Sequence, residues 1–222
     1  MNDHTSSTVL KFLKFISQNK IRSVILITGK NIKESIQNIH YLWIKSSSQK
    51  RNPILWCYKK NSKNYKSVEE NIFTKNYFQN DITPSYCYYE ETQKIIGNTY
   101  GMCVLEDFGS ISPNILARVI ETIEGGGMII FAIETINSIE NLKNVSLDIY
   151  KNWNSHAFPM ITSRFIKNFI FSISECPTFL HLNGDIIDFS KNLKIIHTGN
   201  MMELSLDPRT EEKKKTLSRI NF

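Results

Sequence analysis

Short apolar runs alternate along this chain with segments of helical periodicity, and this alternation most constrains its fold. The runs Arg22–Thr28, Pro53–Tyr58, Gly101–Leu105 and Met128–Ile133 are short and almost continuously apolar. Such runs are typical of strands buried on both faces of a sheet. Strands that alternate with helices predict an α/β fold, a mostly parallel sheet with helices on both faces. The connections between parallel strands should be right-handed.

Three further segments have the spacing of amphipathic helices. Asn31–Lys45 places isoleucines at helical intervals, with Asn31 as a plausible N-cap. Pro113–Glu124 begins with proline and is followed by Gly125-Gly126-Gly127, which we expect to end the helix and turn into the next strand. An anion cradle is the alternative for this glycine triplet. Met160–Ser174 predicts a long apolar helix.

The remaining segments predict a short strand, a loop and a hairpin. Ser85–Tyr89 is a short aromatic strand, and the polar stretch Asn61–Thr83 has the character of a loop or loosely packed insert. Asn183-Gly184 separates the apolar runs Thr178–Leu182 and Ile186–Phe189, a strong hairpin signal.

We expect three parts along the chain. Residues 1–20 form an N-terminal helical lead-in, residues 21–206 form one domain, and residues 207–222 form a charged flexible tail. No apolar run reaches the length of a membrane span, so we expect a soluble intracellular chain with no membrane partner.

The charge is uneven along the chain. Residues 1–70 hold 13 Lys/Arg and 4 Asp/Glu, whereas the rest holds 14 and 17. A basic first third suits an anionic partner such as RNA. The chain also has 32 Ile, 22 Asn and 21 Lys but only 3 Ala. Since these abundant residues have AT-rich codons, part of the lysine excess can reflect codon bias and a merely solvated surface.

The four cysteines predict no metal or redox site. Cys57, Cys87, Cys103 and Cys176 are far apart in sequence, and three of them lie inside apolar runs. We therefore expect reduced thiols, buried as small hydrophobic groups.

The turn after the first strand resembles a phosphate-binding loop without meeting its requirements. Gly29, Lys30 and Lys33 lie between a strand and a helix, the layout in which backbone N–H groups hold phosphates. A working loop needs a second glycine before the lysine and Ser/Thr after it, but Asn31 follows Lys30. The layout is therefore a degenerate phosphate-loop (RecA-like) one, and a plain strand-to-helix turn is the alternative to nucleotide binding.

Two other groups suggest chemistry and have plainer explanations. Glu106-Asp107 ends an apolar strand, where a magnesium-binding acid would lie in such a fold. The alternative is an acidic pair that is simply solvated or that caps the next turn. Tyr86, Tyr88 and Tyr89 could stack nucleic-acid bases, or part of them could belong to the core.

Two stretches of sequence closely resemble a known family. Leu55-Trp56-Cys57-Tyr58-Lys59-Lys60 and the run Tyr86–Phe131 are similar to segments of the eukaryotic RNA cytidine acetyltransferases, the TmcA-type family. The similarity extends from about Ile21 to about Phe189 and is confined to the N-terminal domain of the family. The family's helicase-like and acetyltransferase domains, which use ATP with Mg²⁺ and acetyl-CoA, lie outside this similarity. We therefore expect no cofactor, no metal and no catalytic residue in this chain.

The resemblance also selects residues for a binding role. Possible RNA or partner contacts are Arg51, Lys59, Lys60 and Arg164. The family-signature interface comprises Tyr88, Tyr89, Glu90, Thr92, Gly97 and Asn98. Where the family has an Arg-x-Arg-Thr-Glu stretch this chain has Asn152-Trp153-Asn154-Ser155-His156. That loss of arginine weakens the expectation of direct RNA binding.

The resemblance implies a non-catalytic N-terminal module of the RNA cytidine acetyltransferase system. It would support N4-acetylcytidine formation in rRNA or tRNA and small ribosomal subunit biogenesis, in the nucleus and nucleolus. Its expected partners are a separately encoded acetyltransferase/helicase subunit or pre-ribosomal proteins. The alternatives are a stand-alone RNA- or pre-ribosome-binding domain, a relic of a split acetyltransferase, and a small ATPase.

Overall fold

The computed structural model describes most of the predicted domain. Described are residues 3–46, 53–60, 84–134, 136, 139–145, 147–148, 164–183, 186–189, 193–198 and 201–206. Several predicted segments lie outside these ranges: the insert Asn61–Thr83, the first residues of the helix predicted from Met160, and the tail from residue 207. Arg51 also lies outside them. The three-part division of the chain stays a prediction.

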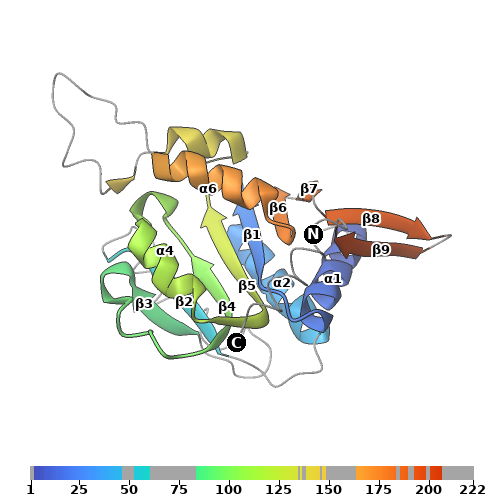
Figure 1. The fold of residues 1–222 in the computed structure, drawn as a ribbon, viewed down its shortest axis with the longest axis horizontal. Coiled ribbons are helices and arrows are strands. Elements are labelled where there is room, and N and C mark those ends of the chain that lie inside the picture. The colour runs from blue at the N-terminus through green and yellow to red at the C-terminus, as the bar shows by residue number, and fades with distance from the viewer. Residues whose placement is uncertain are drawn as a thin grey trace, which may run out of the picture.

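A seven-stranded sheet in the order β3-β2-β4-β5-β1-β6-β7 forms the centre of the fold (Figure 1). The first six strands in this order run parallel to their neighbours. The seventh, β7, runs antiparallel to β6. The strands are β1 Ser23–Thr28, β2 Ile54–Tyr58, β3 Ser85–Tyr88, β4 Tyr100–Leu105, β5 Ile123–Ile133, β6 Phe179–Asn183 and β7 Ile186–Phe189. The predicted α/β fold with a mostly parallel sheet is confirmed, whereas the degenerate phosphate-loop layout stays a prediction.

Helices cover both faces of this sheet, as predicted. One core contains the buried faces of α1 (Asp3–Gln18) and α2 (Ile32–Ser46), and the other contains those of α4 (Pro113–Ile120) and α6 (Arg164–Glu175). Strand residues alternate between the two cores: Ile25 and Ile27 pack with α1 and α2, while Leu26 packs on the opposite face. Three short 3₁₀ helices complete the described connections: η1 Tyr89–Glu91, η2 Phe108–Ser110 and η3 Ile139–Asn144.

A second, two-stranded sheet follows the central one and was not predicted from the sequence. Strands β8 (Leu193–Thr198) and β9 (Met201–Leu206) pair antiparallel. Strand β9 contacts α1, and Figure 1 shows this ribbon beside that helix. The predicted hairpin between β6 and β7 is confirmed by the pairing of Asn183 with Ile186.

The prediction that the glycine triplet ends a helix is wrong. Helix α4 ends at Ile120, and Gly125-Gly126-Gly127 lies inside β5. The pairing with β4 shifts there, from Tyr100 opposite Ile123 to Met102 opposite Met128, so the triplet accommodates an irregularity in the strand. A Cβ added at Gly127 would lie 2.5 Å from the carbonyl oxygen of Gly101. Close approach of two backbones therefore requires glycine here.

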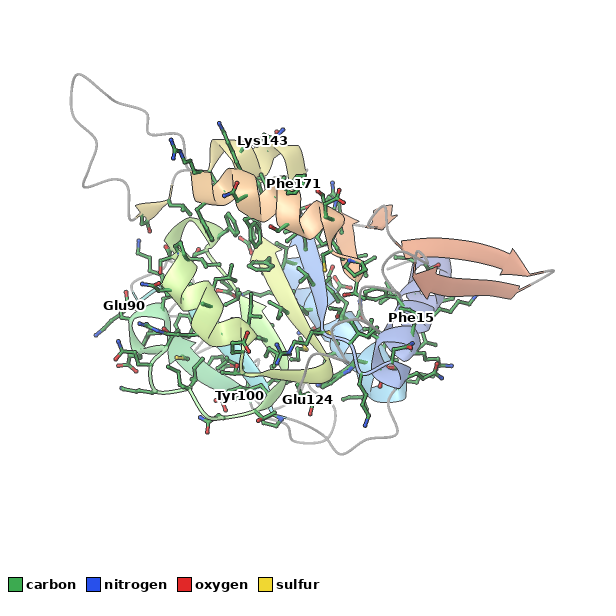
Figure 2. The ribbon with its side chains drawn as sticks, viewed as in Figure 1. Phe15, Glu90, Tyr100, Glu124, Lys143 and Phe171 are labelled. Atoms are coloured by element: carbon green, nitrogen blue, oxygen red, sulfur yellow. The ribbon has the colours of Figure 1, made fainter. Side chains whose placement is uncertain are left out.

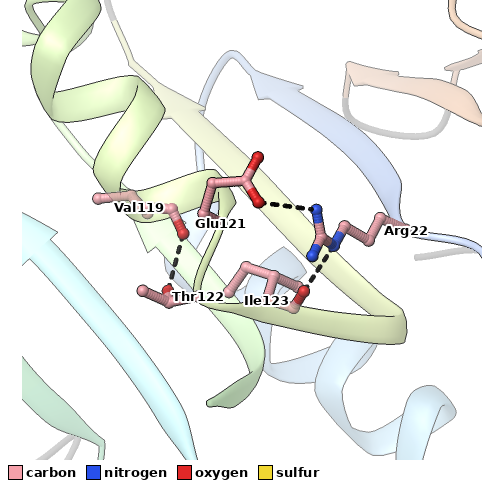
Figure 3. Close-up of polar contacts among 5 residues, drawn as sticks. All are labelled: Arg22, Val119, Glu121, Thr122 and Ile123. Atoms are coloured by element: carbon pink, nitrogen blue, oxygen red, sulfur yellow. Dashed lines mark hydrogen bonds and ion pairs between the residues drawn. The ribbon is translucent and has the colours of Figure 1, made fainter. Parts of the chain in front are cut away.

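Polar contacts fix the junction between α4 and β5 (Figure 3). Thr122 Oγ1 donates to the carbonyl oxygen of Val119 at 2.7 Å. Arg22 Nε donates to the carbonyl oxygen of Ile123 at 2.6 Å, and its guanidinium lies 3.7 Å from the carboxylate of Glu121. Because Arg22 immediately precedes β1, these contacts hold the start of β5 beside the start of β1.

The cysteines and the lengths of the helices can be compared with the sequence predictions. All four cysteines are free, with Cys57, Cys87 and Cys103 buried and Cys176 half-buried, as expected for packed thiols. Among the helices of the described ranges, none is long and apolar enough to cross a membrane.

Three aromatic rings form the centre of the core under α6. Phe131 of β5 lies 6.0 Å from Phe108 and 5.1 Å from Phe169, measured between ring centroids. Both pairs are edge-to-face, a favourable arrangement for aromatic rings. This cluster ties β5, η2 and α6 together.

We expect Phe131→Ala to lower the free energy of unfolding by about 3–5 kcal/mol, because it removes a buried ring and leaves a cavity. Denaturant unfolding followed by circular dichroism measures this loss. Phe171→Ala is the matched control, since Phe171 lies on the outer side of α6 with 68% of its surface exposed (Figure 2). Equal effects of the two substitutions would contradict the central role of the cluster.

Candidate functional site

Four charged residues follow the carboxyl ends of neighbouring parallel strands. Lys30 follows β1, Lys59 follows β2, Glu106 follows β4 and Glu134 follows β5. Because these strands are parallel, their carboxyl ends meet at one edge of the sheet, where ligands bind in open α/β folds. This edge is therefore the candidate functional site.

The turn after β1 is closed on one side by protein. Gly29 has a φ of 92° and Asn31 a φ of 61°. A Cβ added at Gly29 would lie 2.8 Å from Asn183 Oδ1, so the side chain of Asn183 from β6 lies against the turn. Lys30 is exposed and Lys33 is half-buried in the first turn of α2. The turn keeps the glycine and the lysines of the sequence prediction, but Asn183 occupies the space beside the glycine.

Glu106 is a buried acid at this edge, with 7% of its surface exposed. Burial raises the pKa of its carboxyl to about 7, and the charges of Asp107 and Glu134 add to this shift. The charge of Lys33 and a hydrogen bond from the Trp56 side chain act in the opposite direction. Glu106 is therefore protonated in a large fraction of molecules near neutral pH.

The neighbouring Asp107 is less deeply buried and its backbone is unusual. Its φ of 50° lies in the left-handed region, which non-glycine residues seldom adopt. Burial raises the pKa of Asp107, while the charge of Lys59 lowers it. Among the described residues, neither Glu106 Oε2 nor Asp107 Oδ2 has a hydrogen bond of standard geometry. The alternative that this acidic pair is simply solvated is therefore wrong.

Backbone contacts hold Glu106 in place. Its N–H donates to the carbonyl oxygen of Cys57 at 3.1 Å, and its carbonyl oxygen accepts a short hydrogen bond from the hydroxyl of Tyr89. Both partners are buried and belong to the sheet or to η1. The position of this carboxyl is therefore set by the fold and not by a flexible loop.

Lys59 is held in an ion pair instead of projecting freely. Its Nζ lies 2.6 Å from Asp148 Oδ2, and Ser110 Oγ donates to the same oxygen at 2.7 Å. The hydrogen bond to Asp148 raises the pKa of Lys59. Since Asp148 already compensates this charge, Lys59 is a weaker candidate for phosphate contact than its sequence position suggested.

The other predicted contact residues are dispersed. Lys60 Nζ lies 5.8 Å from the ring centroid of Tyr88. Arg164 is the exposed first residue of α6, and none of the described contacts joins it to Lys59 or Lys60. Arg51 lies outside the described residues. Binding of RNA or a partner through these residues stays a prediction.

The predicted signature interface divides into buried and exposed residues. Tyr89 and Thr92 are buried, and Thr92 Oγ1 donates to the carbonyl oxygen of Tyr89 at 3.0 Å. Glu90, which Figure 2 shows at the surface, is exposed, as are Gly97 and Asn98. Tyr89 and Thr92 thus shape the segment, and a partner would meet the exposed residues.

One buried polar pair near this edge was not predicted from the sequence. Thr28 Oγ1 and His181 Nε2 lie 3.0 Å apart, on the neighbouring strands β1 and β6. Only the register of the two strands brings them together, and no local sequence signal gives that register. Within the described ranges, no group of three or more His, Cys, Asp and Glu side chains could hold a metal ion.

We expect Glu106→Gln to stabilise the protein at pH 8 by up to about 3 kcal/mol, with little effect at pH 4. The carboxyl binds its proton more tightly in the folded protein, with a pKa of about 7, than in the unfolded chain, so wild-type stability falls as the pH rises through 4.5–7. Glutamine stays neutral and does not contribute this loss. Urea unfolding of both proteins at several pH values measures the difference.

The comparison at each pH removes the contribution of other groups. Burial lowers the pKa of His40 to about 4, so His40 makes stability rise with pH between about 4 and 6.5, the opposite sign. The contribution of His40 to stability is the same in the wild type and in Glu106→Gln. Glu34→Gln, at an exposed site in α2, is the control, and an unchanged difference between pH 4 and pH 8 for Glu106→Gln would contradict the assignment.

We expect no saturable binding of ATP at the turn after β1. The second glycine and the Ser/Thr of a working phosphate loop are missing from Gly29-Lys30-Asn31, and Asn183 lies against Gly29. Titration of the chain with a fluorescent ATP analogue and Mg²⁺ measures this. Saturable binding that depends on magnesium and is lost in Lys30→Ala would contradict the expectation and favour a small ATPase.

Known proteins match this chain over nearly its whole length. A family model described as "tRNA(Met) cytidine acetyltransferase TmcA, N-terminal" matches residues 1–183. The RNA cytidine acetyltransferase of Homo sapiens is 33% identical over 86% of this chain and 20% of the relative. That of Schizosaccharomyces pombe is 33% identical over 96% of this chain and 22% of the relative. That of Saccharomyces cerevisiae is 31% identical over 80% and 19%.

The chain thus spans about a fifth of the length of these curated relatives. The matching family model describes the N-terminal part of the family and covers the central sheet up to the end of β6. The expectation drawn from Leu55–Lys60 and Tyr86–Phe131 is therefore confirmed: the chain belongs to the RNA cytidine acetyltransferase family and corresponds to its TmcA-type N-terminal region.

Proposed function

We propose that this chain is a non-catalytic N-terminal module of the RNA cytidine acetyltransferase system. It supports the formation of N4-acetylcytidine in rRNA or tRNA and the biogenesis of the small ribosomal subunit, in the nucleus and nucleolus. The acetyl-CoA and the ATP with Mg²⁺ that the reaction uses are bound by other domains of the system. The match to the N-terminal region of the family over most of this chain carries the proposal.

The chemistry of the candidate site favours a supporting role. The turn at Gly29 departs from a working phosphate loop, and Lys59 is neutralised by Asp148. The buried acid Glu106 is partly protonated near neutral pH, and in the part of the chain that the structure describes no group of three or more His, Cys, Asp and Glu side chains could hold a metal ion beside it. This edge of the sheet is therefore better suited to binding a partner than to catalysing a reaction.

The proposed partners are a separately encoded acetyltransferase/helicase subunit or pre-ribosomal proteins. The segment from η1 to β4 is the proposed docking surface, and it exposes Ile96, with 61% of its surface accessible, beside Gly97 and Asn98. Single exposed apolar side chains are common on protein surfaces, so the family match carries the choice of partner and Ile96 provides a position at which to test it.

A second candidate function is RNA binding by the chain itself. Lys60, which lies over the ring of Tyr88, favours it, as does the excess of basic over acidic residues in positions 1–70. Such binding would weaken steeply with salt, because phosphate contacts release counterions.

We expect tagged protein, purified from its native cell, to bring down an acetyltransferase subunit or pre-ribosomal proteins. Ile96→Asp should lower their recovery at least about fivefold, because a buried apolar contact of 1–3 kcal/mol is replaced by a charge. Quantitative mass spectrometry of the purified material measures the recovery. Phe171→Asp is the matched control, an exposed apolar residue on α6.

Two outcomes would contradict the proposal. A clean monomer with neither class of partner would exclude the module role. Equal losses for Ile96→Asp and Phe171→Asp would exclude the segment around Ile96 as the docking surface. Since both residues are exposed, neither substitution should prevent folding, which thermal unfolding of the purified variants checks.

A further inference from the structure

Two tyrosines on the edge strand β3 present their rings on one face of the sheet. Tyr86 and Tyr88 are two positions apart, so their side chains leave the strand on the same side, about 6.6 Å apart along it. Tyr86 has 36% of its surface exposed and Tyr88 is half-buried. In the strand order of the sheet β3 is outermost. The two rings therefore lie at the margin of the fold.

A third tyrosine packs beside these rings, on the neighbouring strand β2. Tyr58 of β2 is buried, and its ring centroid lies 6.3 Å from that of Tyr86 and 5.1 Å from that of Tyr88. The pair with Tyr86 is edge-to-face and the pair with Tyr88 is tilted. Rings packed in this way lose little conformational freedom when a flat ligand stacks on them.

A lysine supplies positive charge at the same place. Lys60 Nζ lies 5.8 Å from the ring centroid of Tyr88, within reach of a cation–π contact. The nearby Lys59 is already paired with Asp148, and Glu91 is paired with Lys94 at 2.9 Å. Among the described residues Lys60 forms no ion pair with an acid, and the ring of Tyr88 is the contact that holds its ammonium group here.

We propose that Tyr86, Tyr88 and Lys60 form a stacking platform for single-stranded RNA. Aromatic rings on a sheet stack unpaired bases, and a neighbouring lysine contacts the phosphate between them. Tyr88 packs in part against the core under α1 and α2, so its remaining exposed surface and the more exposed ring of Tyr86 would form the platform. The inference rests on the proposed role in RNA acetylation only for the choice of RNA over single-stranded DNA.

The surface fits this ligand better than an apolar protein segment. Both rings carry hydroxyl groups, and the positive charge of Lys60 lies over the ring of Tyr88. Burial raises the pKa of Tyr86 and the charge of Glu106 adds to this shift, so an acid also lies near the platform. A double helix hides the base faces that such rings stack on. Binding should therefore show little sequence preference and should favour single strands.

Fluorescence anisotropy of a labelled 12-nucleotide single-stranded RNA of mixed sequence, titrated with the purified full chain at low salt, tests the platform. We expect Tyr86→Leu and Tyr88→Leu each to weaken binding about 5- to 150-fold, the range of one lost base stack. Tyr86→Phe and Tyr88→Phe keep the rings and should bind nearly as wild type. Lys60→Gln should reduce the slope of log affinity against log salt by about 0.7.

Tyr41→Leu is the matched control, because Tyr41 is a similarly exposed tyrosine (44%) on α2. Absence of RNA binding at low salt, or equal affinities for wild type, Tyr86→Leu and Tyr88→Leu, would overturn the platform. So would a loss of affinity in Tyr41→Leu as large as that in Tyr86→Leu. The phenylalanine variants separate loss of stacking from loss of folding at the half-buried Tyr88.

The test is independent of the co-purification experiment, because it uses the purified chain and RNA alone. If Tyr86→Leu leaves RNA affinity unchanged but removes a protein partner from the native-cell purification, the surface is a protein interface and the platform is wrong. If Tyr86→Leu weakens RNA binding while partner recovery stays as in wild type, the platform and the docking surface are separate.

Discussion

Burial of both faces of one parallel sheet is the constraint on which the rest of the structure depends. Each of the inner strands sends alternate side chains into two different cores, as Trp56 and Cys57 do from adjacent positions of β2. Neither face can then carry solvated polar groups at its centre. Charged and polar residues are left to the ends of the strands and to the outermost strand, and the candidate site and the tyrosine platform lie in those two places.

The same constraint explains why the central strands could be predicted from sequence. A strand buried on both faces is a nearly continuous apolar run, so the predicted boundaries of β1, β2 and β4 lie within one residue of those found. The glycine triplet misled the prediction for a physical reason. Glycine ends helices and also permits close backbone approach, and the contact of Gly127 with Gly101 that decides between the two depends on the pairing of β5 with β4.

The site was predictable in position but not in chemistry. Lys59 and Glu106 follow apolar runs, which places them at one edge of a parallel sheet. The partner of Lys59 is Asp148, 89 residues away, and the burial of Glu106 depends on neighbours from other strands. Tyr89 and Thr92 belong to the run Tyr86–Phe131 that resembles the family, and we assigned them to an interface, yet their side chains are buried within the fold. Long-range packing, which local pattern does not contain, determines each of these outcomes.

The edge of the sheet also departs from what stability alone would favour. Glu106 is a buried acid whose pKa lies near neutrality, and Asp107 beside it holds a left-handed backbone. Both features cost free energy of folding, and neither is offset by a strong ion pair among the described residues. Burial raises the pKa of Tyr86, and the charge of Glu106 adds to this shift, so the acid and the stacking platform share one electrostatic environment. Protonation of Glu106 removes a negative charge near Tyr86, which lowers the repulsion that an anionic ligand meets there. Local violations of this kind concentrate where a protein binds something, so the same edge that the sheet leaves polar is where binding should be sought.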